Sequence, residues 1–313
     1  MRHRKLLAVC GVLVALGFFS TLASAGPIAF YVQGGILPNA PSYLWDYGCS
    51  PTSAGMMMGY YDVNGYGGLR YDNLVPGGQA EPSTWPYPPS RSPQADSVIA
   101  SAGHIADFYG GDTNRGNDNY LASGDDVTGP FHAFDSLADF MGSSQDSIGN
   151  VNGSTTFYYF TDGTRLTAED AYTYGIWNAD GMYGIWEYLD YAGYTAPRGN
   201  FFTQLIDSQG PYGMSFTDYM GFIDAGNVVM IQVAGHSMFG YGYDTGNIVY
   251  FYDTWNNAQH SMIWGGSYAG LDHWGVTVFE PAGGSAAVPE PGSLFLLGTG
   301  LVGLGRAWRK RRG

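Results

Sequence analysis

The chain has 313 residues, of which 16% are aromatic, 13% are charged and 48 are glycine. This composition is typical of a folded, turn-rich protein, because disordered chains are poor in aromatic residues and rich in charge. Residues 26–280 hold five arginines and no lysine against 26 acidic residues, which argues against nucleic-acid binding, since such a body repels phosphates and anionic lipid.

The first 25 residues have the three parts of a secretory signal peptide. Three basic residues precede an apolar run from Leu6 to Phe19, and Ala23 and Ala25 supply the small residues that signal peptidase requires. A run of about 14 apolar residues is short for a membrane span, which needs about 20. We therefore expect the Sec translocon to export the chain and signal peptidase to cleave it after Ala25.

Helix signals lie mainly in the first two thirds of the body, which we place at residues 26–280. The strongest covers residues 53–61, with Ser50 as the N-cap and Pro51 at the first helical position. Weaker helix signals lie at residues 92–108, 131–141 and 168–192. Gly175 and Gly181 are expected to interrupt the last of these.

Strand signals follow the helices. They lie at residues 228–233, 237–243, 248–252 and 276–279. Gly246 and Asn247 predict a tight turn between two of the strands. Helices followed by an antiparallel sheet indicate the α+β class.

The C-terminal end combines a flexible linker with a tripartite tail. Small residues at 281–288 lead to Pro289, Glu290 and Pro291, followed by an apolar run at 294–304 and a basic terminus. Residues 289–313 resemble the PEP-CTERM sorting signal of Gram-negative bacteria. The resemblance implies processing by an exosortase, a transient inner-membrane attachment through the apolar helix, and delivery to the cell envelope or the exterior. A permanent transmembrane anchor is the alternative.

Removal of the signal peptide with Cys10 leaves Cys49 as the single cysteine. Exported domains normally use cysteines in pairs, so an unpaired cysteine is either buried and inert or kept for its reactivity. Cys49 directly precedes the predicted helix start, where unpaired N–H groups and the helix dipole favour a thiolate. A thiolate is the nucleophile that covalent acyl transfer requires.

A general base for this nucleophile is expected on the late strands. His236 lies in a Gly-His turn after the predicted buried strand at residues 228–233. Asp253 directly follows the predicted strand at residues 248–252 and lies beside a tryptophan. Neighbouring strands can hold an imidazole and a carboxylate in contact, so that Asp253 fixes the tautomer of His236. His260 is an alternative base.

The segment from Tyr47 to Tyr61 resembles the nucleophile helix of the C39-like cysteine peptidases, which have a papain-like fold. The Gly-His strand followed by Asp-x-Trp resembles the second half of the same family. The resemblance implies a peptide or protein substrate, with Cys49 as nucleophile, His236 as general base and acid, and Asp253 as the orienting carboxylate. Ser50 stands where these peptidases have Gly, and Tyr43 stands where they place the Gln that helps to bind the oxyanion.

Two other functions remain open on the sequence. The body could be a catalytically inactive surface or matrix protein that binds exopolysaccharide or protein partners through its aromatic and acidic face. Asp112, Asn114 and Asp118 lie on alternate positions around a glycine, as in calcium loops, but a solvated turn is the favoured interpretation. No other cofactor is indicated.

The remaining histidines of the body are expected to pack or to satisfy core hydrogen bonds. These are His104, His132 and His273.

Overall fold

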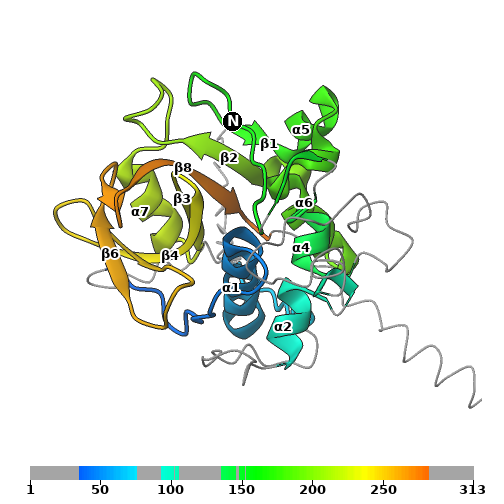
Figure 1. Ribbon diagram of the computed structural model, residues 1–313. Coiled ribbons are helices and arrows are strands. Elements are labelled where there is room, and N and C mark those ends of the chain that lie inside the picture. The colour runs from blue at the N-terminus through cyan, green and yellow to red at the C-terminus, as the bar shows by residue number, and fades with distance from the viewer. Residues whose placement is uncertain are drawn as a thin grey trace, which may run out of the picture.

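Helices and one antiparallel sheet build the body, as Figure 1 shows, so the predicted α+β class is confirmed. The computed structural model describes residues 35–75, 93–101, 103–105, 135–145, 148–151 and 153–281. The helices are α1 (Cys49–Asn64), α2 (Pro93–Ile99), α4 (Leu137–Phe140), α5 (Ala168–Tyr174), α6 (Gly181–Tyr191) and α7 (Phe216–Asp224), with 3₁₀ turns η3 (Trp177–Ala179) and η4 (Arg198–Asn200).

The strands form one eight-stranded sheet in which every pair is antiparallel. They are β1 (Leu166–Thr167), β2 (Phe201–Leu205), β3 (Val229–Val233), β4 (His236–Asp244), β5 (Ile248–Tyr252), β6 (His260–Ile263), β7 (Ser267–Tyr268) and β8 (Leu271–Phe279). The order is β1-β2-β8-β3-β4-β5-β6, and β7 pairs with β8. The four strands and the turn at Gly246 predicted from the sequence are confirmed, while β2 and β6 widen the sheet beyond them.

The predicted helix around residues 53–61 is confirmed, but it begins earlier. Gly48 is its N-cap, so the prediction that Ser50 caps it is wrong. Ser50 lies inside the first turn, and its hydroxyl is 2.8 Å from the hydroxyl of Ser237 on β4. The side chain therefore joins the helix to the sheet.

The long helix signal at residues 168–192 corresponds to two helices. Gly175 ends α5 in the left-handed conformation, with φ of 71°, which confirms the first interruption. Gly181 instead begins α6, because Asp180 accepts a hydrogen bond from the Met182 amide as the N-cap. The signal at residues 92–108 corresponds to α2, which ends at Ile99, and a second helical piece at residues 103–105.

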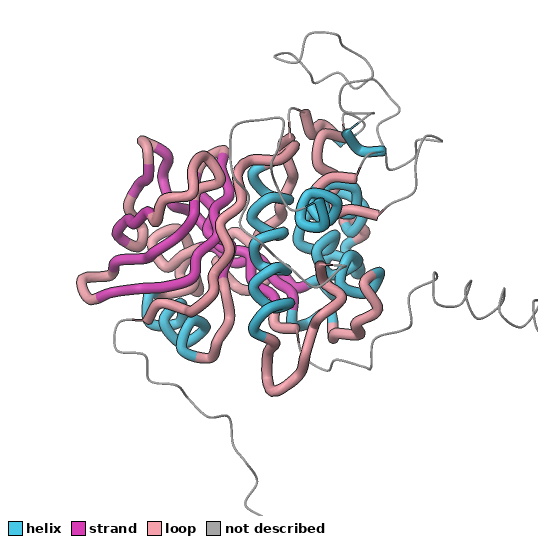
Figure 2. Tube along the Cα trace, turned by 90° about the horizontal axis from the view of Figure 1, so that it is seen from below, coloured by secondary structure: helices cyan, strands magenta, loops and turns pink. Residues whose placement is uncertain are grey.

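Helix α1 lies between the sheet on one side and helices α2 and α4 on the other, as Figure 2 shows. Its residues from Ser50 to Tyr61 are all buried, as expected for a helix that is small and apolar on every side. Glycine permits this close packing: a Cβ on Gly55 would lie 2.5 Å from Cγ1 of Ile99 on α2. Helix α1 is thereby packed closely against α2 as well as against the sheet.

Helix α7 contacts β3 and β4 from the sheet face opposite α1. The hydroxyl of Tyr219 on α7 donates to the Gly242 carbonyl, and a Cβ on Gly240 would lie 3.0 Å from that hydroxyl. Ser237 points to α1, whereas Gly240, three residues later on β4, faces the opposite side of the sheet because successive residues of a strand alternate. The two faces of β4 are therefore both covered.

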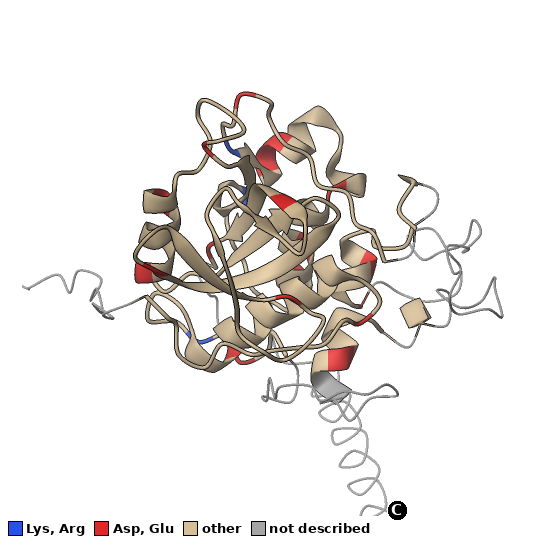
Figure 3. Ribbon diagram, turned by 60° about the vertical axis from the view of Figure 1, so that its left-hand side comes forward, with Lys and Arg blue, Asp and Glu red and all other residues tan. Residues whose placement is uncertain are grey.

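Acidic residues are scattered along the described part of the chain with few basic residues between them, as the ribbon in Figure 3 shows. No helix in the described part of the chain has the length and apolar character needed to cross a membrane. The predicted signal peptide and sorting tail lie outside the described residues, as do the candidate calcium ligands Asp112, Asn114 and Asp118.

Candidate active site

The chain makes a constrained turn just before Cys49. Tyr47 has a φ of 56° and Gly48 a φ of 153°, which residues with a side chain rarely adopt. A Cβ on Gly48 would also lie 2.7 Å from the Gly153 carbonyl oxygen. The turn therefore needs glycine at this position, and it places Cys49 as the first residue of α1.

The Cys49 thiol forms a hydrogen bond with the side chain of His236, although 187 residues separate the two in the sequence. Cys49 is partly exposed and His236 is buried at the start of β4. The backbone N–H of Ser237 and the hydroxyl of Ser50 also bond to the sulfur. The fold thus brings together the predicted nucleophile and its predicted base.

The two groups shift each other toward their charged forms. Burial raises the pKa of the Cys49 thiol, but the hydrogen bond and positive charge of His236 outweigh it, so that the pKa lies below its ordinary value. Burial lowers the pKa of His236, yet the contact with Cys49 and the nearby Asp253 raise it above its ordinary value. Both shifts are in the direction of a thiolate–imidazolium pair.

The ring of His236 is held from two further sides. Its Nε2 lies 2.7 Å from the backbone carbonyl oxygen of Asp253, and the ring stacks on Trp255 with centroids 4.3 Å apart. A carbonyl only accepts, so Nε2 carries the hydrogen. The other ring nitrogen, Nδ1, is thereby left to exchange a proton with the thiol.

Asp253 meets His236 through its main chain, whereas the sequence predicted contact through the carboxylate. Thr254 follows with a φ of 66°, and this left-handed turn directs the carboxylate elsewhere. The carboxylate accepts from the amides of Trp255 and Asn256 and, at 2.7 Å, from the Tyr268 hydroxyl. These hydrogen bonds hold the turn in which the Asp253 carbonyl orients the His236 imidazole.

His260, the alternative base, also lies beside Asp253. Its Nε2 is 3.3 Å from the Asp253 carboxylate and 3.0 Å from Oδ1 of Asn256. These contacts make His260 a part of the turn that supports the His236 ring.

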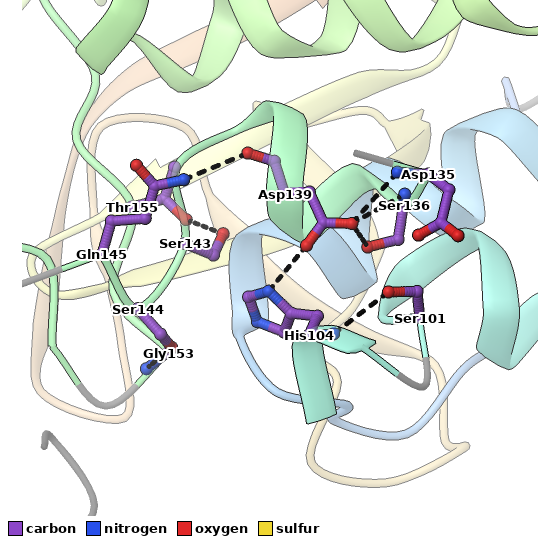
Figure 4. A network of polar contacts seen from close by, with 10 residues as sticks. All are labelled: Ser101, His104, Asp135, Ser136, Asp139, Ser143, Ser144, Gln145, Gly153 and Thr155. Carbon is purple, nitrogen blue, oxygen red and sulfur yellow. Dashed lines mark hydrogen bonds and ion pairs between the residues drawn. The ribbon is translucent and has the colours of Figure 1, made fainter. Parts of the chain in front are cut away.

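A fully buried histidine–carboxylate pair lies in the helical half, as Figure 4 shows. Nδ1 of His104 is 2.9 Å from Oδ1 of Asp139, whose other oxygen accepts from the Ser136 hydroxyl. Burial raises the pKa of Asp139, but the contact with His104 and the hydrogen bonds outweigh it and lower the pKa. The pair joins residues 103–105 to α4, in line with the packing role expected for His104.

His273 also packs in the core. Burial lowers its pKa to about 4, so the ring is neutral, and Nδ1 accepts from the Gly265 amide. His132 lies outside the described residues.

The site includes two buried polar residues that sequence reasoning missed. The Ser237 hydroxyl donates to Oε1 of Gln232 at 2.7 Å, and Nε2 of Gln232 donates to Thr277 at 3.2 Å. One signal was available, because Gln232 is the only polar residue in the otherwise apolar strand Val-Met-Ile-Gln-Val. A polar residue on a buried strand requires a partner.

Donors for an oxyanion can be assigned in part. The backbone N–H of Cys49 has no acceptor within its helix, because the first amides of any helix lack one. Tyr43, at the position of the expected Gln, is buried in the core. Asn39, the nearest upstream amide side chain, donates to Asn64 at the C-terminal end of α1 and therefore lies away from Cys49.

The described residues contain no group of three or more His, Cys, Asp or Glu side chains that could hold a metal ion.

The C-terminal segment matches a known family model. Residues 287–312 match the PEP-CTERM protein-sorting motif, which confirms the sorting tail predicted at residues 289–313. No curated protein matches the chain, and no solved structure matches it either. The chain is therefore an exported protein whose C-terminal tail is processed by an exosortase, and the match covers the tail but not the body.

Proposed function

We propose that the body is a papain-like, C39-like cysteine peptidase that hydrolyses or transfers peptide or amide bonds outside the cytoplasm of a Gram-negative cell. The observation that carries the proposal is the hydrogen-bonded pair of Cys49 and His236 at the first turn of a buried helix. A nucleophile helix packed on an antiparallel sheet whose strand supplies the imidazole is the arrangement expected for such an enzyme.

The reaction would proceed in two steps. The Cys49 thiolate attacks the carbonyl carbon of the substrate, and the C–N bond breaks as the His236 imidazolium gives its proton to the leaving amine. His236 then takes a proton from water, which attacks the thioester and releases the acid. In transfer, a second amine replaces the water. Asp253 acts as a positioning residue through its carbonyl, and Trp255 covers the ring.

Charge on the carbonyl oxygen would be stabilised by the Cys49 backbone N–H. The loss of one oxyanion donor typically costs about 100- to 1000-fold in rate. Because Tyr43 replaces the expected Gln, we expect turnover to be slower by about this factor than in a site with both donors.

A second candidate is a non-catalytic module that binds exopolysaccharide or protein partners. Aromatic rings on α5, η3 and α6 favour it: Tyr172, Tyr174 and Trp177 are exposed, and the Arg198 guanidinium lies 4.4 Å from the ring centre of Tyr172 and 4.5 Å from that of Trp186. Grouped exposed aromatic residues mark interaction surfaces. In this case Cys49 would be a structural thiol.

The rate of Cys49 alkylation by iodoacetamide at pH 6.5 separates the two functions. A thiol with the ordinary pKa of about 8.5 is about 1% ionised at this pH. We expect rapid alkylation of the wild type and about 100-fold slower alkylation of His236→Ala. His260→Ala removes the alternative base and one support of the turn beside His236, so it should slow alkylation far less than His236→Ala does. Slow alkylation of the wild type, or equal rates in wild type and His236→Ala, would refute the peptidase.

A further inference from the structure

A row of buried polar side chains extends from the nucleophile through the sheet. It begins with Ser50 on α1, whose hydroxyl lies 2.8 Å from that of Ser237 on β4. It continues through Gln232 on β3 to Thr277 on β8. All four residues are buried, so each hydrogen must be used inside the protein.

Counting hydrogens fixes the direction of these bonds. Gln232 donates through Nε2 to Thr277 and to the Met230 sulfur, so Oε1 is its acceptor. The Ser237 hydroxyl has one hydrogen and donates it to this Oε1 at 2.7 Å. The short contact between the two serines then requires Ser50 to be the donor and Ser237 the acceptor.

The Ser50 hydroxyl has a second acceptor within reach, the sulfur of Cys49. Since a hydroxyl has one hydrogen, it cannot serve both acceptors fully. A neutral thiol is a weak acceptor, whereas a thiolate accepts a charge-assisted hydrogen bond that is roughly twice as strong as a neutral one.

We propose that the Ser50 hydroxyl divides its hydrogen between the Cys49 sulfur and the Ser237 hydroxyl, and that Gln232 sets this division by holding the hydrogen of Ser237. The inference rests on the proposed function in that it takes Cys49 as the nucleophile. Ser50 and Gln232 are positioning residues that adjust how readily the thiol ionises. When the thiolate forms, the Ser50 hydroxyl donates to the sulfur, and the Ser237 hydroxyl loses the hydrogen bond that it accepted from Ser50. The loss of this bond opposes the ionisation of Cys49, which the Ser50 hydroxyl by itself would promote.

The proposal predicts opposite effects from neighbouring substitutions. Ser50→Ala removes a donor to the sulfur and should raise the pH of half-maximal alkylation. Ser237→Ala removes the competing acceptor, and Gln232→Met lets Ser237 donate to Ser50; both release the Ser50 hydrogen to the sulfur and should lower that pH. One hydrogen bond of ordinary strength corresponds to about a 3- to 10-fold change in the alkylation rate below the midpoint.

Ser53→Ala is the matched control. Its hydroxyl, one turn along α1, donates to the Ser237 carbonyl at 3.1 Å and so ties the same helix to the same strand. A purely structural effect of weakening this contact would appear in Ser53→Ala, in which we expect an unchanged midpoint.

The experiment measures iodoacetamide alkylation of Cys49 against pH in the wild type and the four variants, each shown to be folded by circular dichroism. Shifts of opposite sign for Ser50→Ala and for Ser237→Ala or Gln232→Met support the proposal. Shifts of the same sign, or none, with a low wild-type midpoint overturn this inference alone. A wild-type midpoint near the ordinary value of about 8.5 overturns the proposed function as well.

Discussion

Replacement of Asp253 by Asn tests whether the imidazole is oriented by a carbonyl or by a carboxylate. In Asp253→Asn, Oδ1 can still accept from the amides of Trp255 and Asn256, and the new amide group faces the Tyr268 hydroxyl, which can accept as well as donate. The main-chain carbonyl, 2.7 Å from Nε2 of His236, is unchanged.

The expected loss of stability in Asp253→Asn follows from these contacts. Charge-assisted bonds become neutral ones, which lowers the free energy of unfolding by roughly 1–2 kcal/mol. The alkylation rate of Cys49 at pH 6.5 should stay within about 10-fold of the wild type. Where a carboxylate itself contacts the catalytic imidazole, the same substitution costs about 10⁴-fold in kcat.

Asp253→Ala is the companion variant. It removes the acceptor of two backbone amides and one hydroxyl together with the contact to His260, and we expect the free energy of unfolding to fall by roughly 3–5 kcal/mol. The turn that presents the carbonyl should then relax and slow alkylation further. Urea unfolding and alkylation kinetics measure both quantities. If Asp253→Asn lost 1000-fold or more in rate at unchanged stability, orientation by the carbonyl would be wrong.

Three further predictions concern the rest of the body. Burial raises the pKa of Asp180 to about 7, so the folded state binds this proton more tightly than the unfolded state. The resulting stabilisation is complete below about pH 4, and about 4 kcal/mol of it is lost as the pH rises to 7. Asp180→Asn keeps the N-cap, and its free energy of unfolding in urea should not show this decline. Gly48→Ala should destabilise the protein by about 1–3 kcal/mol in thermal unfolding, because of the positive φ and the nearby Gly153 carbonyl. Gly221→Ala should stabilise it by about 0.5–1 kcal/mol, because Gly221 lies inside α7 with open space around it. Deletion of residues 282–313 should leave the alkylation rate of Cys49 unchanged; a change of more than about 3-fold would show that the tail contacts the site.

The sequence was sufficient to predict the parts of the fold that have a local signal. Small and apolar residues after Pro51 predicted α1, and runs of β-branched and aromatic residues predicted four strands. Helix α7 also had a local signal that was overlooked: Ser215 and Asp218 form a capping box, in which each side chain accepts from the backbone amide of the other. Strand β2 had no comparable signal, because its partner β8 lies about 70 residues later in the chain.

Which residues of the candidate site lie together could be predicted from the sequence, but which of their atoms are in contact could not. Sequence order pointed to Cys49, His236 and Asp253, and the fold places all three together. Which atom of Asp253 meets the ring depends on the left-handed turn at Thr254. Such a conformation costs of order 1–3 kcal/mol and persists only where surrounding contacts hold it, so no local pattern indicates it.

The described part of the chain ends away from Cys49, where the chemistry is proposed. The Tyr61 hydroxyl donates to the Phe279 carbonyl and that of Tyr71 to the Pro281 carbonyl, so the last described residues lie at the C-terminal end of α1. Twelve residues of helix, about 18 Å, separate Tyr61 from Cys49. The register of the sheet gives the same separation. Val278, near the end of β8, pairs with Val229 at the start of β3, whereas His236, at the start of β4, pairs with Val233 at the end of β3. Residues 282–293 precede the apolar run and can span at most about 43 Å, so an apolar run in the membrane would hold the body within this distance of the bilayer by the end of α1 opposite its nucleophile. The thiol would therefore be free to meet its substrate both before and after an exosortase removes the tail.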